Sequence, residues 1–166
     1  MSCMTQLAYT PLDEDPVSRL ERLSAGRLPG LLGVEILSAG PGELRSRLPL
    51  RPDHLAGNGY LHAGSVVTLA DTSAGYGCQV SLPEGATGFT TAELKSNFLA
   101  TATDGALACR AWLVHGGRTT QVWDAEVTHE ETGRTLALFR CTQVLLYPRE
   151  RPGPSDPRER PGPWAA

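Results

Sequence analysis

The C-terminal half of the chain alternates between apolar and polar residues, which is the pattern of strands with one buried face. From residue 121 to 128 the alternation places Trp123 and Val127 on one face and Asp124 on the other. The segment 134–147 is more continuously apolar, which favours a place inside the sheet. Glycine-containing turns separate the segments at residues 103–105, 116–117 and 131–133. The pattern therefore predicts four strands, at residues 88–99, 105–115, 119–130 and 134–147.

The N-terminal half predicts a short helix, a pair of strands and a long helix. Residues 13–23 begin with acids and then mix leucine with arginine, as a short amphipathic helix does, and residues 27–30 (RLPG) end it. A loop at residues 52–60 precedes the long helix, which is expected from residue 61 to about residue 80. The two strands between the helices lie at residues 33–39 and 43–50, with the turn Gly40–Pro41–Gly42.

The long helix is apolar and rich in small residues. It contains Gly64, Gly75 and Gly77, each of which costs roughly 1 kcal/mol relative to alanine in a helix interior. Such a helix gains its stability from close packing, and it has too little polar surface to face water. We therefore expect it to be buried and gripped by a curved sheet.

This order of elements predicts an α+β fold, with an antiparallel sheet and the long helix packed on one of its faces. Such a sheet leaves its edge strands open, so pairing with a second copy of the chain is expected. Three regions are expected: residues 1–30 with the short helix, one domain at residues 31–147, and a disordered tail at residues 148–166, where proline, arginine, glycine and acidic residues dominate.

The composition excludes several classes of function. The chain has 166 residues, enough for one domain with a substantial core. Its net charge of −3 argues against an electrostatic surface for nucleic acid or membrane. No apolar run approaches the ~20 residues that span a bilayer. Residues 1–15 lack the basic segment and apolar core of a secretion signal, so the expected location is the cytoplasm.

The four cysteines are widely spaced and form no Cys-x-x-Cys pair, at positions Cys3, Cys78, Cys109 and Cys141. This spacing does not favour metal ligands. Buried free thiols in a reducing compartment are the better interpretation. We predict no metal and no cofactor.

One carboxylate, Asp71, lies within the long helix. Aspartate is seldom buried without a partner, because an unpaired buried charge is expensive. Two interpretations stay open. The carboxylate acts as a general base on water or as a nucleophile, or it forms a structural hydrogen bond to Thr72, Ser73 or a neighbouring loop. Burial raises the pKa of a carboxyl group and amide donors lower it, so sequence alone does not give its protonation state.

The start of this helix, His62–Ala63–Gly64, is a second candidate for chemistry. The first turn of a helix offers free backbone N–H groups and the positive end of the helix dipole. Small residues there let a ligand carbonyl approach, as an oxyanion hole requires. Asp71 lies nine residues beyond His62, about 13.5 Å away at roughly 1.5 Å per residue. If both groups are catalytic, they must meet across an interface between two copies.

The loop before the helix offers two further polar side chains, Asn58 and His54. Asn58 can orient a carbonyl or a water, although an asparagine between two glycines is more often a turn former. His62 is likewise more often a structural hydrogen-bonding residue than a base. Ser65 has no Gly-x-Ser-x-Gly context, and no glycine-rich segment ends in Lys-Ser/Thr. A serine hydrolase and a phosphate-binding loop are therefore not indicated.

Several segments together resemble one family. Residues 61–76 (LHAGSVVTLADTSAGY) are similar to the His-Gly-Gly-x(6)-Asp helix of the hotdog-fold acyl-CoA thioesterases. The closer match is the phenylacetate-pathway (PaaI-type) branch, which includes one class of 4-hydroxybenzoyl-CoA thioesterases. Residues 90–99 (TTAELKSNFL) resemble that branch's strand after the helix, and residues 117–125 and 132–137 its later hairpin. The resemblance covers residues 31–147. It implies a long central helix wrapped by an antiparallel sheet, dimers that pair into tetramers, and no metal.

The resemblance also implies roles for single residues. Asp71 stands at the catalytic carboxylate, which acts on the thioester or on its attacking water. Ala63 stands where the family usually has the first glycine after the motif histidine, here His62, and its backbone N–H would polarise the thioester carbonyl. Thr91 falls, within one residue, at a Ser/Thr that helps to place the water. Arg118 lies in a turn where relatives contact the CoA nucleotide.

One departure concerns the loop before the helix. The family often has Asn or Gln six residues before the motif histidine, and this chain has Ala56 there. Asn58 lies two residues later and would substitute if the loop runs differently. The departure puts the contact that orients the carbonyl in doubt.

The leading hypothesis is a cytoplasmic acyl-CoA thioesterase that converts acyl-CoA and water into free acid and CoA. A hotdog dehydratase or hydratase is an alternative, but it needs a histidine paired with a carboxylate for proton transfer, and His62 is nine residues from Asp71. A non-catalytic acyl-CoA-binding or regulatory protein is favoured if the missing amide at Ala56 is decisive. The acyl group is not predicted, because the pocket of such a fold forms from dispersed side chains at a subunit interface.

Overall fold

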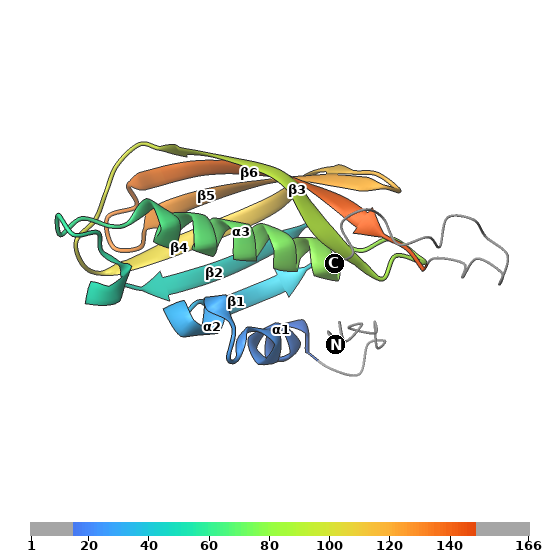
Figure 1. Ribbon diagram of the computed structural model, residues 1–166, viewed down its shortest axis with the longest axis horizontal. Helices are drawn as coiled ribbons and strands as arrows, with labels where there is room; N and C mark the ends of the chain where they lie inside the picture. The colour runs from blue at the N-terminus through green and yellow to red at the C-terminus, as the bar shows by residue number, and fades with distance from the viewer. Residues whose placement is uncertain (1–14, 149–166) are drawn as a thin grey trace, which may run out of the picture.

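The computed structural model describes residues 15–148, which form a six-stranded antiparallel sheet with one long helix packed across it (Figure 1). The helices are α1 (Pro16–Ser24), α2 (Leu28–Leu32) and α3 (Ala63–Val80), with a 3-10 turn, η1, at Pro52–His54. The strands are β1 (Glu35–Gly40), β2 (Glu43–Pro49), β3 (Gly88–Phe98), β4 (Ala106–Gly116), β5 (Thr120–His129) and β6 (Thr135–Leu146). Their order across the sheet is β1-β2-β4-β5-β6-β3, with every neighbouring pair antiparallel.

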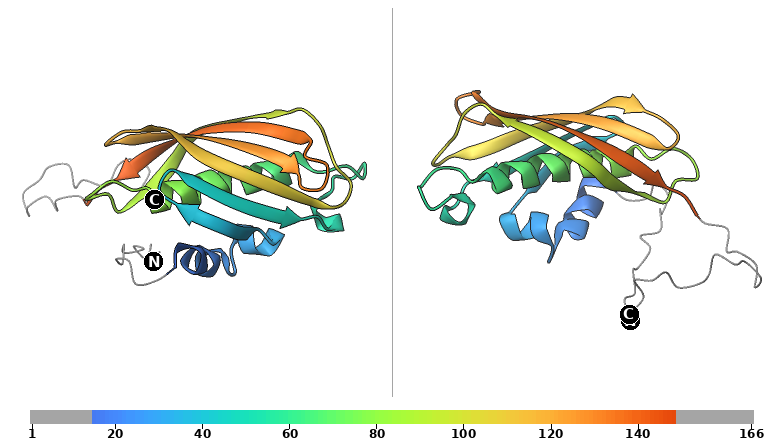
Figure 2. Two further views of the ribbon diagram at one scale, coloured as in Figure 1. Left: turned by 180° about the vertical axis from the view of Figure 1, so that it is seen from behind. Right: turned by 45° about the horizontal axis from the view of Figure 1, so that its top comes forward.

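This architecture is the predicted α+β hotdog arrangement. The sheet curves around α3, and α1 and α2 lie beside β1 on the same side of the sheet (Figure 2). The limits of all six strands fall within two residues of those expected from the sequence. The prediction that residues 134–147 form an inner strand is confirmed, because β6 lies between β5 and β3.

The segment 27–30, expected only to end the first helix, instead enters a second short helix, α2. Helix α1 ends at Ser24, and Pro29 then lies in the first turn of α2. A proline is tolerated there, because its missing N–H has no helical partner in the first turn. Gly33 ends α2 in the left-handed conformation, with a φ of 80°. The predicted start of the first helix at residue 13 and the predicted tail from 149 onward lie outside the described residues.

Aromatic rings press directly onto the backbone of α3 in its C-terminal half. A Cβ atom at Gly77 would lie 2.6 Å from Cζ3 of Trp123, a fully buried residue of β5. A Cβ at Gly75 would lie 3.1 Å from Cζ of Phe89 on β3. The glycines that disfavour this helix in isolation therefore permit the close packing on which it depends.

The opposite side of α3 is not buried, which corrects the expectation of a helix enclosed on all sides. His62 and Ala63 are exposed, and Thr68, Asp71 and Thr72 are partly buried. The sheet covers one side of the helix, and no layer of the described residues covers the other.

Strand β3 is an open edge of the sheet. Leu94 and Phe98 pair with Cys141 and Ala137 on β6, both of which are buried against α3. The two β3 side chains therefore point to the face of the sheet that carries α3. Their exposed fractions are nevertheless 42% and 48%. An edge strand with exposed apolar residues is a template for pairing with another chain.

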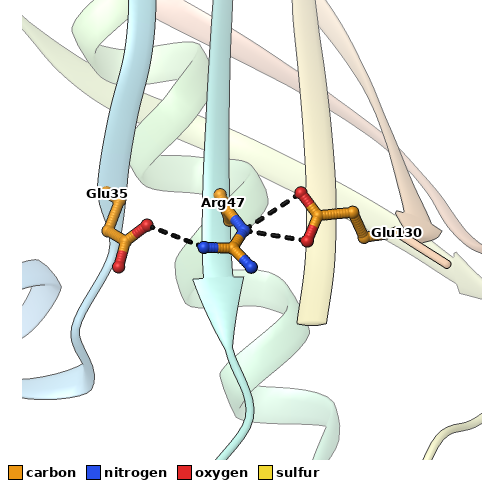
Figure 3. Close-up of polar contacts among 3 residues, drawn as sticks. All are labelled: Glu35, Arg47 and Glu130. Carbon is orange, nitrogen blue, oxygen red and sulfur yellow. Dashed lines mark hydrogen bonds and ion pairs between the residues drawn. The ribbon is translucent and has the colours of Figure 1, made fainter. Parts of the chain in front are cut away.

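The outer face of the sheet, away from α3, carries ion pairs between neighbouring strands. Arg47 on β2 reaches Glu35 on β1 at 3.3 Å and Glu130, just after β5, at 2.8 Å (Figure 3). Arg140 on β6 binds Asp124 on β5 through two hydrogen bonds. This face is therefore polar and solvated rather than a second core.

The cysteines within residues 15–148 are free and buried, as predicted, at Cys78, Cys109 and Cys141. Burial raises the pKa of each thiol, to about 12, about 11 and about 12 respectively. Cys3 lies outside the described residues. Within this part of the chain no three His, Cys, Asp or Glu side chains gather as metal ligands would, and no helix is long and apolar enough to cross a membrane.

Candidate active site

Asp71 presents an unsatisfied carboxylate on the open side of α3. Its Oδ1 atom is buried without a hydrogen-bond partner among the described residues. Burial raises the pKa of this carboxyl group above its ordinary value of 3.8. The structural alternative, a hydrogen bond to Thr72, Ser73 or a neighbouring loop, does not form at this oxygen, and the Ser73 hydroxyl donates instead to the carbonyl of Leu69 at 2.6 Å. Asp71 therefore keeps one hydrogen-bond acceptor unpaired within the described chain, on a side chain that is only partly buried.

The first turn of α3 leaves one backbone amide free. His62 is the N-cap residue, and its Nδ1 atom accepts the N–H of Gly64 at 2.9 Å. The carbonyl of His62 accepts the N–H of Ser65 at 3.0 Å. The Ala63 N–H has no partner among the described residues, and Ala63 is exposed. The only amide of this turn that can meet a substrate oxygen is thus the one that the sequence analysis selected.

This cap depends on glycine at position 64. A Cβ atom there would lie 2.9 Å from Nδ1 of His62, so a larger residue would displace the ring. His62 uses its Nδ1 lone pair in the cap and places a proton, if it is neutral, on Nε2. The histidine therefore shapes the turn, and Nδ1 is not available as a base.

Buried His54 anchors the loop to this turn. Its carbonyl oxygen accepts both the His62 N–H at 2.9 Å and the Ser65 hydroxyl at 3.0 Å, and its Nδ1 accepts the Arg51 N–H at 3.1 Å. The sequence analysis noted His54 only as a polar neighbour of Asn58. Its full burial has no signature in a polar loop sequence.

Asn58 lies at the exposed tip of this loop and acts as a turn former. Its Oδ1 accepts the Tyr60 N–H at 3.2 Å. The loop is closed beneath it by two backbone bonds of Ala56, which donates to Tyr60 and accepts from Gly59. The Asn58 side-chain N–H groups have no partner among the described residues, so they can still bind a ligand.

Thr91 and Arg118 lie away from the first turn of α3, on β3 and in the β4–β5 turn. Thr91 points to the inner face of β3, is exposed, and donates its hydroxyl to Oε1 of Gln143 on β6 at 3.0 Å. Arg118 is exposed in the β4–β5 turn, where its carbonyl accepts the Tyr147 hydroxyl.

The predicted residues thus do not all meet in one chain. His62, Ala63 and Asn58 surround the start of α3. Asp71 lies halfway along it with Thr91 on the neighbouring strand, and Arg118 belongs to its far end. Figure 1 shows the two ends of α3 at opposite sides of the molecule. The sequence analysis missed Gln143, although the two-residue alternation of β6 places it on the inner face among apolar residues.

Comparison with known proteins identifies the family. The model of the thioesterase superfamily matches residues 58–136, which include the start of α3, Asp71, Thr91 and Arg118. The 1,4-dihydroxy-2-naphthoyl-CoA hydrolase of Listeria monocytogenes is 33% identical over 111 residues, covering 67% of this chain and 89% of that protein. The chain belongs to the thioesterase superfamily.

Solved structures of this superfamily have the same fold. Thioesterase HI1161 from Haemophilus influenzae superposes with a TM-score of 0.75 at 25% identity, over 88% of this chain and 96% of that one. The PaaI protein of the E. coli phenylacetic acid degradation operon superposes with a TM-score of 0.65 at 26% identity, over 71% of this chain and 83% of that one. The resemblance to the hotdog thioesterases, including the PaaI-type branch, is confirmed.

Proposed function

We propose that the protein is an acyl-CoA thioesterase, which hydrolyses acyl-CoA to a free acid and CoA. The observation that carries the proposal is the Asp71 carboxylate, which is partly buried, has an oxygen without a hydrogen-bond partner, and faces the open side of α3. Such a group can take a proton from water as a general base does. Membership of the thioesterase superfamily and the name of the Listeria relative support a CoA thioester as the substrate.

The site is completed by a second copy of the chain. Roughly 13.5 Å of helix separate Asp71 from the first turn of its own α3. The open edge β3 exposes Leu94 and Phe98 on the helix side of the sheet, and pairing along this edge would cover them. The α3 helix of the second copy would then lie beside the first. A dimer is the smallest assembly with a complete site, and a tetramer of two dimers is the assembly that the family resemblance implies.

The chemistry divides between the two copies. Asp71 of one copy takes a proton from water, and the water oxygen attacks the carbonyl carbon of the thioester. The Ala63 N–H of the other copy donates to the carbonyl oxygen as it gains negative charge. The C–S bond then breaks, and the proton held by Asp71 leaves with the CoA sulfur. In a second route Asp71 attacks the carbonyl carbon itself, the C–S bond breaks and CoA leaves as the thiolate. Water then opens the mixed anhydride, which regenerates the Asp71 carboxylate, releases the acid and supplies the proton that the thiolate takes up.

The remaining predicted residues have supporting roles in this scheme. His62 holds the first turn so that the Ala63 amide points outward. Asn58 offers its free amide N–H groups to the substrate carbonyl, Thr91 contacts the attacking water, and Arg118 contacts the CoA nucleotide. The Nδ1 atom of His62 is occupied by the cap, which argues against a dehydratase or hydratase that moves protons through this histidine.

A non-catalytic acyl-CoA-binding protein is the second candidate. It is favoured by Ala56, which stands where the family often has an amide side chain and whose backbone groups are bonded within the loop. With no amide at that position, a thioester carbonyl would be held only by the Ala63 N–H and by whatever Asn58 supplies.

Release of CoA from a panel of acyl-CoAs distinguishes the two candidates. The panel includes aromatic, medium-chain and short-chain thioesters, with the aromatic ones first because of the Listeria relative's name. Asp71→Asn should lower kcat by about 10²- to 10⁴-fold, as the loss of a general base does, while acyl-CoA still binds. Asn58→Ala should mainly raise KM.

Two outcomes would overturn parts of the proposal. Binding of acyl-CoA by the wild type without release of thiol from any member of the panel would favour the binding protein. Full activity in Asp71→Asn would leave the enzyme class standing and refute the role of this carboxylate.

A further inference from the structure

Gln143 is a fully buried polar side chain within the sheet. It lies on the inner face of β6 with an exposed fraction of 0%. Both ends of its amide are nevertheless bonded. Oε1 accepts the hydroxyl of Thr91 on β3 at 3.0 Å, and Nε2 donates to Sγ of Cys141 at 3.2 Å. A buried amide that is hydrogen-bonded at both its oxygen and its nitrogen holds one orientation. Exchanging the two ends would leave Oε1 and Nε2 without these partners.

The bond to Gln143 fixes what Thr91 can offer to a ligand. A threonine hydroxyl has one proton to donate and two lone pairs that accept. Thr91 gives that proton inward to Gln143, whereas its side chain is on the exposed edge strand. Any molecule that meets Thr91 from the open side therefore finds a hydrogen-bond acceptor.

The packing of β3 against α3 places Thr91 on the side of the helix that carries Asp71. The ring of Phe89 on β3 packs against α3 at Gly75. Asp71 lies one helical turn before Gly75 on the same face of α3, and Thr91 lies two residues beyond Phe89 on the same inner face of β3. Cys141 stays a neutral thiol with its pKa at about 12 and accepts the Gln143 N–H. Thr91, Gln143 and Cys141 thus form a continuous chain of hydrogen bonds from the sheet edge inward, and Thr91 is the member on the side of Asp71.

We propose that Gln143 is a positioning residue for the hydrolytic water: by taking the Thr91 proton it makes Thr91 an acceptor for one O–H of that water. Asp71 accepts the other O–H. With both protons directed to oxygen acceptors, a water lone pair is left to attack the carbonyl carbon. One proton passes to Asp71 as the C–O bond forms, and the other remains on the new carboxylic acid. This inference rests on the proposed thioesterase activity.

The chain contains a matched control for Gln143. Gln121 faces Gln143 directly across the β5–β6 ladder and has an exposed fraction of 2%. Its amide is also bonded at both ends: Nε2 donates to the Ser81 carbonyl, and Oε1 accepts the indole N–H of Trp123, each at 2.8 Å. It has no contact with Thr91. Replacing either glutamine by methionine removes one buried amide from this cross-strand pair. Only the change at Gln143 removes the hydrogen-bond partner of Thr91.

The test measures kcat and KM separately for the full chain with the best acyl-CoA of the panel. We expect Gln143→Met and Thr91→Val each to lower kcat by about ten- to hundredfold with KM within about twofold, since misplacing a reactant acts on the chemical step. The double variant should be no slower than the slower single variant. Gln121→Met should lose thermal stability to a similar extent and keep the wild-type kcat.

Stability measurements on each variant separate folding from positioning. If Gln143→Met does not fold, Gln143→Asn shortens the side chain by one methylene, withdraws the acceptor from Thr91 and should show the same loss of kcat. Thr91→Ser keeps the hydroxyl and should keep kcat within about threefold.

The proposal and the function on which it rests fail in different ways. An active wild type that is inactivated by Asp71→Asn, together with full kcat in Gln143→Met or Gln143→Asn, would overturn the role of Gln143 alone. Equal losses of kcat in Gln121→Met and Gln143→Met would do the same, because they would indicate a general packing effect. A wild type that hydrolyses no thioester would instead refute the proposed function.

Discussion

The C-terminal half of α3 and its first turn both depend on glycine, for different reasons. Gly77 lets the buried ring of Trp123 approach the helix backbone, where a Cβ would lie 2.6 Å from the ring. Gly64 lets the exposed ring of His62 cap the helix, where a Cβ would lie 2.9 Å from Nδ1. The first contact is apolar packing between the sheet and the helix. The second occupies the Gly64 N–H and leaves the Ala63 N–H free. One end of the helix therefore provides stability and the other provides a binding group, with Asp71 between them.

The largest expected effect on stability comes from the packed end. Gly77→Ala should destabilise the fold by about 1 kcal/mol net, because overpacking costs typically 1–3 kcal/mol and exceeds the gain of roughly 1 kcal/mol in helix propensity. Trp123 is fully buried and has no free direction in which to move. Denaturant midpoints at constant m-value measure the change. A variant as stable as the wild type would refute the close packing described here.

The same substitution at the open end should separate stability from rate. Gly64→Ala removes the His62 cap, worth about 1 kcal/mol, and gains a similar amount of helix propensity, so the midpoint should hardly move. The kcat for acyl-CoA hydrolysis should fall, because the displaced ring frees a second amide and no longer orients the turn. Equal losses of stability in Gly64→Ala and Gly77→Ala would erase the contrast between the two ends.

Asp71 should make stability depend on pH in a defined direction. Burial raises its pKa in the folded chain above 3.8, so its protonated form favours folding, and that contribution is lost as pH rises through the folded pKa. Relative to wild type, Asp71→Asn should therefore gain stability as pH rises from about 3.5 to 7. Urea unfolding of both proteins across this range measures the difference. A difference that stays constant with pH would mean that the carboxylate is not desolvated.

The smallest effect is expected on the outer face of the sheet, away from α3. Arg47→Met breaks the contacts with Glu35 and Glu130, which are solvent-exposed. Exposed ion pairs contribute little and are screened by salt. The unfolding midpoint should therefore change only slightly, and the difference from wild type should shrink further in high salt. A loss comparable to that of Gly77→Ala would show that this face carries more of the fold than its exposure suggests.

The sequence predicts most of the architecture because its signals are periodic. The alternation in β5 identifies its buried face, and glycine-containing turns place the strand limits. Helix α2 escapes prediction because five residues around Pro29 are too few to show a period. The open side of α3 also escapes it, since an apolar helix that its own chain covers on one side has the same composition as one that is covered all round.

The candidate site is predictable in its residue types and less so in its contacts. Asp71 and the start of α3 stand out because they break an apolar pattern. The hydrogen bond from Thr91 to Gln143 depends on the register of β3 against β6, which includes an irregularity between Thr91 and Glu93. A one-residue shift would turn Thr91 to the other face, so no sequence pattern could assign that contact.

The three buried cysteines have a practical consequence for the experiments above. Thiol reagents attack the thiolate, and thiols with pKa values of about 11 to 12 that are also shielded from solvent present almost none of it. A chromogenic disulfide reagent should therefore report CoA released by the folded enzyme without a signal from Cys78, Cys109 or Cys141. In a Cys3→Ser background, the same reagent would reveal unfolding as the slow appearance of three further thiols per chain. The same thiol assay then measures both CoA release and unfolding of the protein.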